Sequence, residues 1–453
     1  MKGEELDKLL SITSYKPIFD FLKYVKPVWY NNIPAKSPIW ISDVHKKYLN
    51  NQIYRTELAR FADSRYQAWT KGEIPVKDAK IADQETVMNI YDNYVFLRRY
   101  FSKVWVYYAL IIRILSLKNP IKEVKAFVKS RNQKRYPIHK ELVSKSPELI
   151  TDNLPRVSVI IPTLNRYEYL KDVLDDLKAQ DYPDFEVIVI DQSDPFIPSF
   201  YSGYGMNITV EHQEERALWK ARNRAITLAS GEYVLLFDDD SRIEKDWIKW
   251  HVTCVQHFNA EISSGVSFSK VGDRIPETYK YFKLSDQLDT GNVLIKKSVF
   301  LKTGLFDLQF EKQRMGDGEF GLRCHLLGIR NISNPRASRL HLKVGQGGLR
   351  QMGSWDAYRT KKWLGPRPVP SVLYFFRRYF GVEATIYHVL VHLPASYIPY
   401  RFKSNRYLML TPLLLFPFLF PLMVFSFYQS WKHATRKIDE GPNIDQLIKT
   451  ENA

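Results

Sequence analysis

The sequence predicts an α/β protein whose central sheet is mixed and mostly parallel, with a helical region on either side. Two short apolar runs rich in strand formers, at residues 156–162 and 185–190, are separated by a segment of helical periodicity. That β-α-β order is typical of a parallel sheet. A third apolar run, Tyr233–Phe237, leads directly into three aspartates. Ligands of such sheets bind beyond the carboxyl ends of the strands, so we expect a site there.

Composition sets the broad class. The chain has 453 residues and 45% hydrophobic content, which suits a large core and two to four structural units. A net charge of +17 indicates an anionic partner such as nucleic acid, an anionic membrane or phosphorylated substrates. Two cysteines exclude a disulfide framework, and the first residues lack the apolar segment of a signal peptide. We therefore expect a reducing, cytosolic setting.

The first 150 residues read as a helical N-terminal region. Apolar residues recur at three- and four-residue spacing over 46–70 and 83–117, which predicts two helices. The stretch Val104–Leu117 is apolar on nearly all sides, but fourteen residues are too few to span a bilayer. Packing on the catalytic core is the favoured interpretation, and lying on an anionic membrane surface is the alternative. Residues 119–150 carry eight Lys/Arg against three Glu and are expected to be a connector.

Between residues 151 and 350 we expect the α/β domain. The strand at 156–162 ends on a proline, and helices follow at Tyr169–Gln180 and Trp219–Ser230. Gly231 is expected to cap the second helix. No glycine-rich phosphate loop is present in the sequence, so phosphate chemistry must rest on a cation or on basic side chains.

The carboxylates Asp238, Asp239 and Asp240 would repel one another unless a cation or hydrogen-bond donors lay between them. A solvated acidic turn is the alternative. The segments before and after them favour a metal–phosphate site.

At this level the chain resembles family 2 glycosyltransferases, which have the GT-A fold. The resemblance covers roughly residues 155–345 and rests on the order and spacing of segments that are individually weak. These segments are Val157–Arg166, Phe185–Asp194, Trp219–Ala225, Phe237–Trp247, Thr290–Phe300, Gly304–Asp307, Met315–Arg323 and Arg339–Lys343.

The resemblance implies a nucleotide-binding set. Asp191 matches the carboxylate that accepts a hydrogen bond from uracil in relatives, although Gln192 replaces the usual second acid and leaves the base less certain. Arg222 matches a basic residue near the nucleotide, or pairs with the aspartates. Residues matching the loop that lines the nucleotide are Pro162, Thr163, Asn165 and Arg166.

Asp238 and Asp240 match the two ends of the family's DxD motif. The resemblance implies that Asp238 faces the ribose and that Asp240 holds Mn²⁺ or Mg²⁺ on the diphosphate, with Asp239 beside them. Oxygen ligands suit either cation. His341 resembles a histidine that is a further metal ligand in some relatives, whereas a structural role is the alternative.

Asp317 matches the family's catalytic base, which takes the proton of the acceptor hydroxyl. Relatives carry an acid just before this position, where this chain has Gly316. Glu319 is the rival base, and its alternative role is to favour the start of the following helix, which is expected at Phe320–Leu327. Gly291 and Asn292 match a turn near the donor sugar or form a plain turn. Residues 344–350 are expected to be a loop that closes over nucleotide or a surface loop.

Processive members of the family carry a Q-x-x-R-W segment and several membrane spans. Gln351–Trp355 is not that segment, which indicates transfer of one or a few sugars.

Residues 351–453 are expected to form a helical, membrane-associating region. Residues 359–378 contain six Lys/Arg and no acid, interleaved with aromatic residues. The 22 uncharged residues of Tyr407–Tyr428 are long enough to span a bilayer, but three prolines also permit a kinked or re-entrant insertion. A buried helical pair that caps the enzyme is the alternative.

We therefore expect a metal-dependent, inverting, hexosyl-type glycosyltransferase at the cytoplasmic face of the cell membrane. Its donor would be a nucleotide-diphosphate sugar, with UDP expected, and its acceptor a hydroxyl of a saccharide or a lipid-linked saccharide, as in surface polysaccharide assembly. Membrane lipids are expected partners and nucleic acid is not. The rival interpretations are a nucleotidyltransferase of related fold and a non-catalytic protein that binds membranes or nucleic acid.

Overall fold

A computed structural model describes most of the chain. The described residues are 19–25, 48–49, 53–74, 88–137, 142–269, 275, 277–285, 287–345, 356–358, 362, 364–398 and 415–447.

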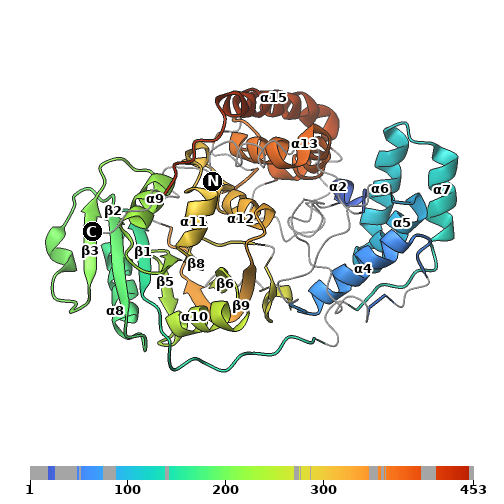
Figure 1. The fold of residues 1–453 in the computed structure, drawn as a ribbon. Coiled ribbons are helices and arrows are strands. Elements are labelled where there is room, and N and C mark those ends of the chain that lie inside the picture. The colour runs from blue at the N-terminus through green and yellow to red at the C-terminus, as the bar shows by residue number, and fades with distance from the viewer. Residues whose placement is uncertain are drawn as a thin grey trace.

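A nine-stranded mixed sheet forms the centre of the molecule (Figure 1). Its order is β3-β2-β1-β4-β8-β6-β9-β5, and β7 pairs with β9. Strands β5, β7 and β8 run against their neighbours, and the other six run in one direction. The fold class predicted from the sequence is confirmed. The strands are β1 Val157–Thr163, β2 Phe185–Asp191, β3 Ile208–His212, β4 Tyr233–Phe237, β5 Ser241–Ile243, β6 Ile262–Ser269, β7 Lys283–Leu284, β8 Asn292–Lys296 and β9 Asn331–His341.

Helices cover both faces of the sheet. On one face α8 (Tyr167–Lys178) and α10 (Trp247–His257) pack against alternate strand residues such as Val159. On the other face α9 (Leu218–Leu228), α11 (Ser298–Thr303) and α12 (Gly316–Leu326) pack against the intervening residues such as Ile160. The period of two along each strand therefore divides the apolar residues between two cores.

The C-terminal helices belong to the second of these cores. Residues of α13 (Pro370–His392) and α15 (Phe416–Glu440) join the apolar cluster that also holds α9, α11 and α12. Figure 1 shows both helices above α12. Helix α13 is kinked at Gly381, whose φ of 77° is a left-handed conformation that glycine adopts without strain. The part of α13 before this kink is almost entirely buried.

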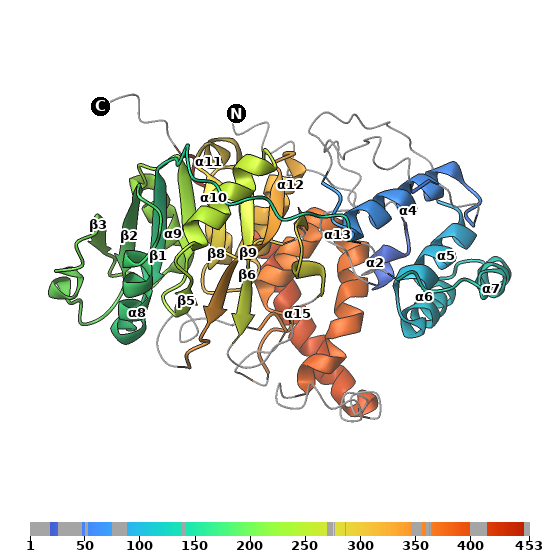
Figure 2. The same ribbon diagram turned by 90° about the horizontal axis from the view of Figure 1, so that it is seen from below.

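The N-terminal region contains short helices that form a separate lobe (Figures 1 and 2). The prediction of one helix over 83–117 was wrong, because Phe101 is extended and Ser102 begins a new helix. The expected connector was wrong at its start, since Asn119 caps a helix and accepts a hydrogen bond from Lys122 N at 3.1 Å. The helices are α2 Leu22–Val25, α4 Glu57–Thr70, α5 Ile90–Tyr100, α6 Lys103–Leu115 and α7 Pro120–Lys129.

Two helix ends in the central domain also differ from the prediction. Helix α9 ends at Leu228, and Gly231 is not its left-handed cap. Gly231 lies instead against β1, where an added Cβ would come within 2.7 Å of the backbone nitrogen of Ser158. Helix α12 begins at Gly316, four residues earlier than predicted, so Asp317 lies in its first turn.

The helical lobe contacts the C-terminal region at α13. The hydroxyls of Ser116 and Tyr387 lie 3.2 Å apart, and Lys23 Nζ is 3.1 Å from Glu383 Oε1. Helix α6 buries Val106, Ala109 and Arg113 and exposes its opposite face.

Within the described residues, none of the helices combines the length and apolar character that crossing a bilayer requires. Part of the apolar run 407–428 belongs to α15, and residues 407–414 lie outside the described part of the chain.

A buried histidine joins α10 to the sheet. His251 Nε2 lies 3.0 Å from Asn292 Oδ1, and its Nδ1 lies 2.9 Å from Ser263 Oγ. The amide nitrogen of Asn292 donates to the carbonyls of Val266 and Ala337, so its Oδ1 is an acceptor and His251 Nε2 carries the proton. Burial lowers the pKa of His251 from 6.5 to about 4.

This histidine should make the fold sensitive to acid. The unfolded chain binds the His251 proton near pH 6.5 and the folded chain only near pH 4, so stability falls as pH drops through this window. The contribution is on the order of 3 kcal/mol. Urea midpoints measured from pH 7.5 to pH 4 should fall less steeply in His251→Gln than in the wild type. Parallel curves for the two proteins would contradict this account.

Candidate active site

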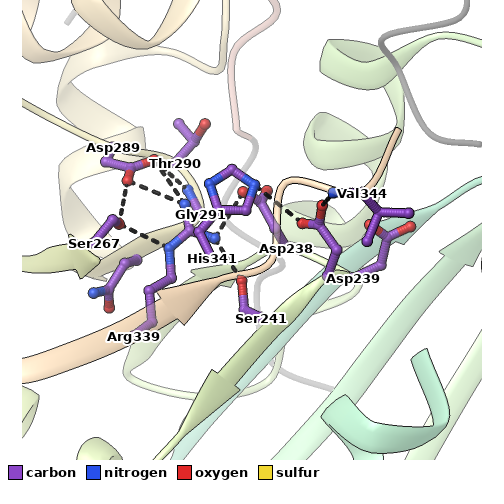
Figure 3. A network of polar contacts seen from close by, with 12 residues as sticks. Asp238, Asp239, Ser241, Ser267, Asp289, Thr290, Gly291, Arg339, His341 and Val344 are labelled. Carbon is purple, nitrogen blue, oxygen red and sulfur yellow. Dashed lines mark hydrogen bonds and ion pairs between the residues drawn. The ribbon is translucent and has the colours of Figure 1, made fainter. Parts of the chain in front are cut away.

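The polar side chains of the predicted site gather at one edge of the sheet. Strands β1, β2, β4 and β9 run in the same direction, so their carboxyl ends meet at this edge. Thr163 and Asp191 end β1 and β2, the aspartates 238–240 follow β4, and His341 ends β9. The structure thus brings together residues that are more than 100 positions apart in sequence (Figure 3).

Asp238 is held between two arginines. Arg339 Nη1 donates to Asp238 Oδ2 at 2.8 Å, and Arg222 Nη2 donates to Asp238 Oδ1 at 3.0 Å. Burial alone would raise the pKa of Asp238, but Arg339 and Arg222 outweigh it and keep that pKa below its usual range. Asp238 is therefore an anion with fixed orientation, and the alternative pairing expected for Arg222 is the one observed.

Arg339 is a site residue that the sequence did not reveal. Its side chain lies between Asp238 and Asp289, with Nη2 at 3.1 Å from Asp289 Oδ2, and Nε donates to Ser267 Oγ at 2.8 Å (Figure 3). Nη1 also donates to Ser241 Oγ at 2.8 Å. The arginine joins the ends of several strands. Its available signal in the sequence was a basic residue between Ser338 and Leu340, two positions before His341.

Gly291 lies directly against this ion pair. A Cβ added there would come within 2.1 Å of Asp238 Oδ2 and 2.3 Å of Arg339 Nη2. The glycine therefore permits the backbone to approach the pair, which a plain turn would not require. Asn292, predicted with it, is fully buried and accepts a hydrogen bond from Trp247 Nε1 at 3.0 Å.

Asp239 points into the protein. Thr163 Oγ1 donates to its Oδ2 at 2.9 Å, and Arg166 Nη1 donates to its Oδ1 at 2.8 Å. Burial raises the pKa of Asp239 to about 6, although Arg166 opposes the shift. These contacts join the loop after β1 to the aspartates. They assign Asp239, Thr163 and Arg166 a positioning role in this structure.

Asp240 and His341 form the other half of the acidic cluster. His341 Nε2 lies 3.2 Å from Asp240 Oδ1, and Arg166 Nη1 lies 3.2 Å from Asp240 Oδ2. One ligand atom each from Asp238, Asp240 and His341 lies within 4.8 Å of the others. Two carboxylates and an imidazole are ligands that Mn²⁺ accepts and that leave positions open for phosphate oxygens. The residues present therefore fit a divalent cation.

Asp317 and Glu319, the two candidate bases, lie in different surroundings. Glu319 is fully buried, where Arg323 binds both its oxygens at 3.0 and 2.9 Å and Tyr379 donates at 2.5 Å. Asp317 is partly exposed in the first turn of α12, and its Oδ1 accepts only a local hydrogen bond from Gly318 N among the bonds described. The geometry thus favours Asp317 as the base.

The departure at Gly316 has a packing reason. A Cβ on Gly316 would lie 2.4 Å from the ring of Trp219, which occupies the space of a side chain there. The same ring lies 5.1 Å from the Arg222 guanidinium. Burial lowers the pKa of Arg222, whereas the charges of Asp238 and Asp317 both raise it. Arg222 thus links the aspartates after β4 to the candidate base electrostatically.

Asp191 is fully buried and already has protein partners. Tyr167 and Tyr201 donate to its Oδ2 at 2.7 and 2.6 Å, and Ser193 N donates to its Oδ1 at 2.8 Å. The nucleobase of a donor could bind Asp191 only through a remaining lone pair of the carboxylate. The role of Asp191 in nucleobase recognition therefore stays a prediction. Gln192 Oε1 accepts a hydrogen bond from Ala217 N at 2.6 Å.

The loop after β1 is ordered by a reciprocal pair of bonds. Asn165 has a left-handed backbone with φ of 53°. Its Oδ1 accepts a hydrogen bond from Asp194 N at 2.9 Å, and its backbone N donates to Ser193 Oγ at 2.7 Å. Pro162 lies within β1 and is buried. Residues 346–350 of the predicted closing loop, and Gln351–Trp355, lie outside the described residues.

Fold and site together define an α/β domain of the GT-A type, with acidic residues at the carboxyl edge of its sheet. Residues 158–313 match the family model described as glycosyl transferase family 2. The chain therefore carries a family 2 glycosyltransferase domain.

Several known proteins are similar to this domain. The poly(ribitol-phosphate) beta-N-acetylglucosaminyltransferase TarS of Staphylococcus aureus is 28% identical over 114 residues, 24% of this chain and 20% of that protein. Glycosyltransferase GlyA of Streptococcus pneumoniae is 30% identical over 119 residues, 25% of this chain and 17% of that protein. These matches span about a fifth of the relatives' length. The solved structure of S. aureus TarS 1-349 in complex with UDP-GlcNAc has 18% identity and a TM-score of 0.41, covering 63% of this chain and 83% of that one.

Replacing Gly291 should test the geometry of the ion pair. In Gly291→Ala the new methyl group must displace Asp238 or Arg339, and we expect transferase activity to fall by about tenfold to a hundredfold. Gly345→Ala is the matched control, because among the described residues no atom lies within 4 Å of a Cβ added there. Initial rates and thermal unfolding of both variants check this. Equal activity in the two variants would show that the pair tolerates displacement.

Proposed function

We propose that this protein is a metal-dependent, inverting glycosyltransferase that transfers a sugar from a nucleotide diphosphate to a hydroxyl acceptor. The observation that carries the proposal is the cluster of Asp238, Asp240 and His341 at the carboxyl edge of the sheet. Asp317 lies in the first turn of α12, where Gly316 packs on the ring of Trp219, and that ring lies 5.1 Å from the Arg222 guanidinium that pairs with Asp238. One set of groups can thus act on the diphosphate and another on the acceptor hydroxyl. The family 2 match supports the same reaction class.

Binding of the donor would use the sheet edge. Asp238 is presented as an anion by its two arginines and is suited to accept hydrogen bonds from ribose hydroxyls. Arg166 and Thr163 fix Asp239, and through it the loop that holds Asn165. This network would orient the nucleotide, and its side chains would need little reorganisation when the donor binds.

Asp240 and His341 would hold Mn²⁺ or Mg²⁺, with Asp238 as the third possible ligand. When bound, the cation supplies charge stabilisation for the departing diphosphate. Arg222 is buried next to Asp238 and adds a fixed positive charge on the same side of the site.

Asp317 would act as the general base. Its carboxylate accepts the proton of the acceptor hydroxyl while the oxygen forms a bond to the anomeric carbon and the bond to the diphosphate oxygen breaks. A single displacement of this kind inverts the anomeric configuration. Asp317 lies in the first turn of α12, where an acidic side chain interacts favourably with the helix dipole.

The donor and acceptor classes are proposed from the similar proteins. The TarS relative is named as a transferase of N-acetylglucosamine to poly(ribitol-phosphate). We propose a UDP-linked hexose-type sugar as donor and a saccharide or lipid-linked saccharide as acceptor, with one or a few sugars added. Polysaccharide assembly at the cell envelope is the setting that this reaction fits.

The donor site can be tested by calorimetry with UDP, GDP, CDP and dTDP, each with Mn²⁺ and then with EDTA. We expect one nucleotide to bind with Mn²⁺, and we expect EDTA or Asp240→Ala to weaken that binding by at least about tenfold, because a phosphate-binding cation is lost. Asp246→Ala, at an acidic residue near the site in sequence but outside the acidic cluster, is the control. No binding by any nucleotide would remove the proposal.

The base can be tested with a pair of matched variants. Asp317→Asn should lower kcat by about a hundredfold to ten-thousandfold and leave donor affinity unchanged, because only proton transfer is lost. Glu319→Gln should lower the unfolding temperature, since it leaves Arg323 buried without its full counter-charge, but it should retain turnover. The reverse result would make Glu319 the base. Release of pyrophosphate instead of a nucleoside diphosphate would identify a nucleotidyltransferase.

A further inference from the structure

The helical lobe carries a large apolar surface on α6 and α7. Leu117 is 94% exposed, Ile121 77% and Val104 73%. Large apolar side chains are exposed singly on most proteins, but several of them on each of two adjoining helices indicate a surface that binds a partner. We call this the docking surface. It consists of Val104, Tyr107, Ile111, Leu115, Leu117, Ile121, Val124 and Val128.

Leu117 is unfavourable in two respects: its backbone conformation is strained, and its apolar side chain is exposed to water. It follows the end of α6 in a left-handed conformation with φ of 57°, within a Schellman turn in which Leu117 N donates to Ile114 O and Lys118 N donates to Arg113 O. Glycine or asparagine is usual at this position, because other side chains are strained there. Leucine at this strained and exposed position is explained if its side chain enters an apolar phase, because glycine and asparagine have no apolar side chain to insert.

The exposed charges of the stretch that carries the docking surface are all of one sign. Residues 101–137 are all described, and their single acidic residue, Glu123, is buried against Arg113 at 2.6 Å. The exposed charges in this stretch are therefore all positive, next to the apolar side chains. They are Lys103, Lys118, Lys122, Lys125, Lys129, Arg131, Lys134 and Arg135.

Further exposed apolar residues, outside the docking surface, lie on the neighbouring C-terminal helices. The contact between Ser116 and Tyr387 brings the end of α6 beside α13, whose second half exposes Val382, Ile386 and Leu390. Helix α15 packs on α13 and exposes a row of phenylalanines near its start, of which Phe418 is 81% exposed. Figure 2 shows α13 and α15 extending from the sheet domain next to the lobe that carries α6 and α7.

We propose that the docking surface binds an anionic phospholipid membrane and lies within its headgroup layer. Apolar side chains flanked by exposed lysines are the composition of interfacial helices, because the apolar groups enter the acyl boundary and the lysines meet lipid phosphates. The apolar face of α6 and α7 lies along the protein surface and belongs to helices of 13 and 10 residues, which suits binding without crossing. The docking surface binds lipid independently of any sugar transfer.

Two other occupants are weaker on these observations. Nucleic acid would use the lysines but would leave the aliphatic side chains in water. A second copy of this chain would bring like charges together around the same apolar residues. Both are outcomes of the experiment below.

The test is co-sedimentation of the full chain with phosphatidylcholine vesicles, with and without phosphatidylglycerol. We expect binding to the anionic vesicles that weakens in 1 M salt. Leu117→Asn/Ile121→Asn should lower the partition coefficient by at least about tenfold, because two inserting side chains become polar. Leu117→Asn alone should raise the unfolding temperature while it weakens binding, since asparagine tolerates the left-handed conformation. Loss of binding therefore cannot result from misfolding.

Leu142→Asn is the control, since Leu142 is 45% exposed in the connector outside the docking surface, and it should bind as the wild type does. Equal binding by the wild type and the double variant would overturn the proposal. Gel filtration showing a dimer that the double variant disrupts would assign the surface to a second copy. If duplex DNA displaced the wild type and the double variant from vesicles to the same extent, the surface would be assigned to nucleic acid.

Discussion

The pairing of Arg339 with Asp238 is the interaction on which the rest of the site depends. It fixes the first aspartate after β4 as an oriented anion, and it connects that aspartate with Asp289 and Ser267 on neighbouring segments. Gly291 exists at its position because the pair leaves no room for a side chain. Arg222 completes the arrangement from α9 and lies beside Trp219, whose ring in turn requires glycine at position 316. This buried ion pair thus accounts for the glycine at position 291 and for the placement of Arg222 and Asp289 around it.

Much of the fold followed from patterns that are local in sequence. The strands β1, β2 and β4 and the helices α8 and α9 were predicted close to their observed bounds, because burial on both faces of a parallel sheet produces short apolar runs. Helix limits were less predictable. At the break the extended Phe101 packs against two apolar clusters of the lobe, and the early start of α12 follows Met315, whose φ is 85°.

The site was predictable where chemistry is concentrated in one stretch and unpredictable where it depends on side-chain direction. The sequence placed Asp238 and Asp240 together with His341, and these residues meet in the structure. It could not show that Asp239 turns inward, that Asp191 is satisfied by Tyr167 and Tyr201, or that Glu319 is sequestered by Arg323. Each of these depends on the direction in which a carboxylate side chain points, and a one-dimensional pattern does not specify that.

The bond from Tyr379 to Glu319 has a consequence for how the chain can be divided. Glu319 lies on the helix that carries Asp317, and Tyr379 lies on α13, just before the kink at Gly381. The segment of α13 that follows the kink is the one that turns outward with Val382 and Ile386. A chain shortened after residue 350 would therefore lose an internal wall of the catalytic domain together with its outer helices. The sheet domain and the C-terminal helices are separate in sequence, but they share one packed core.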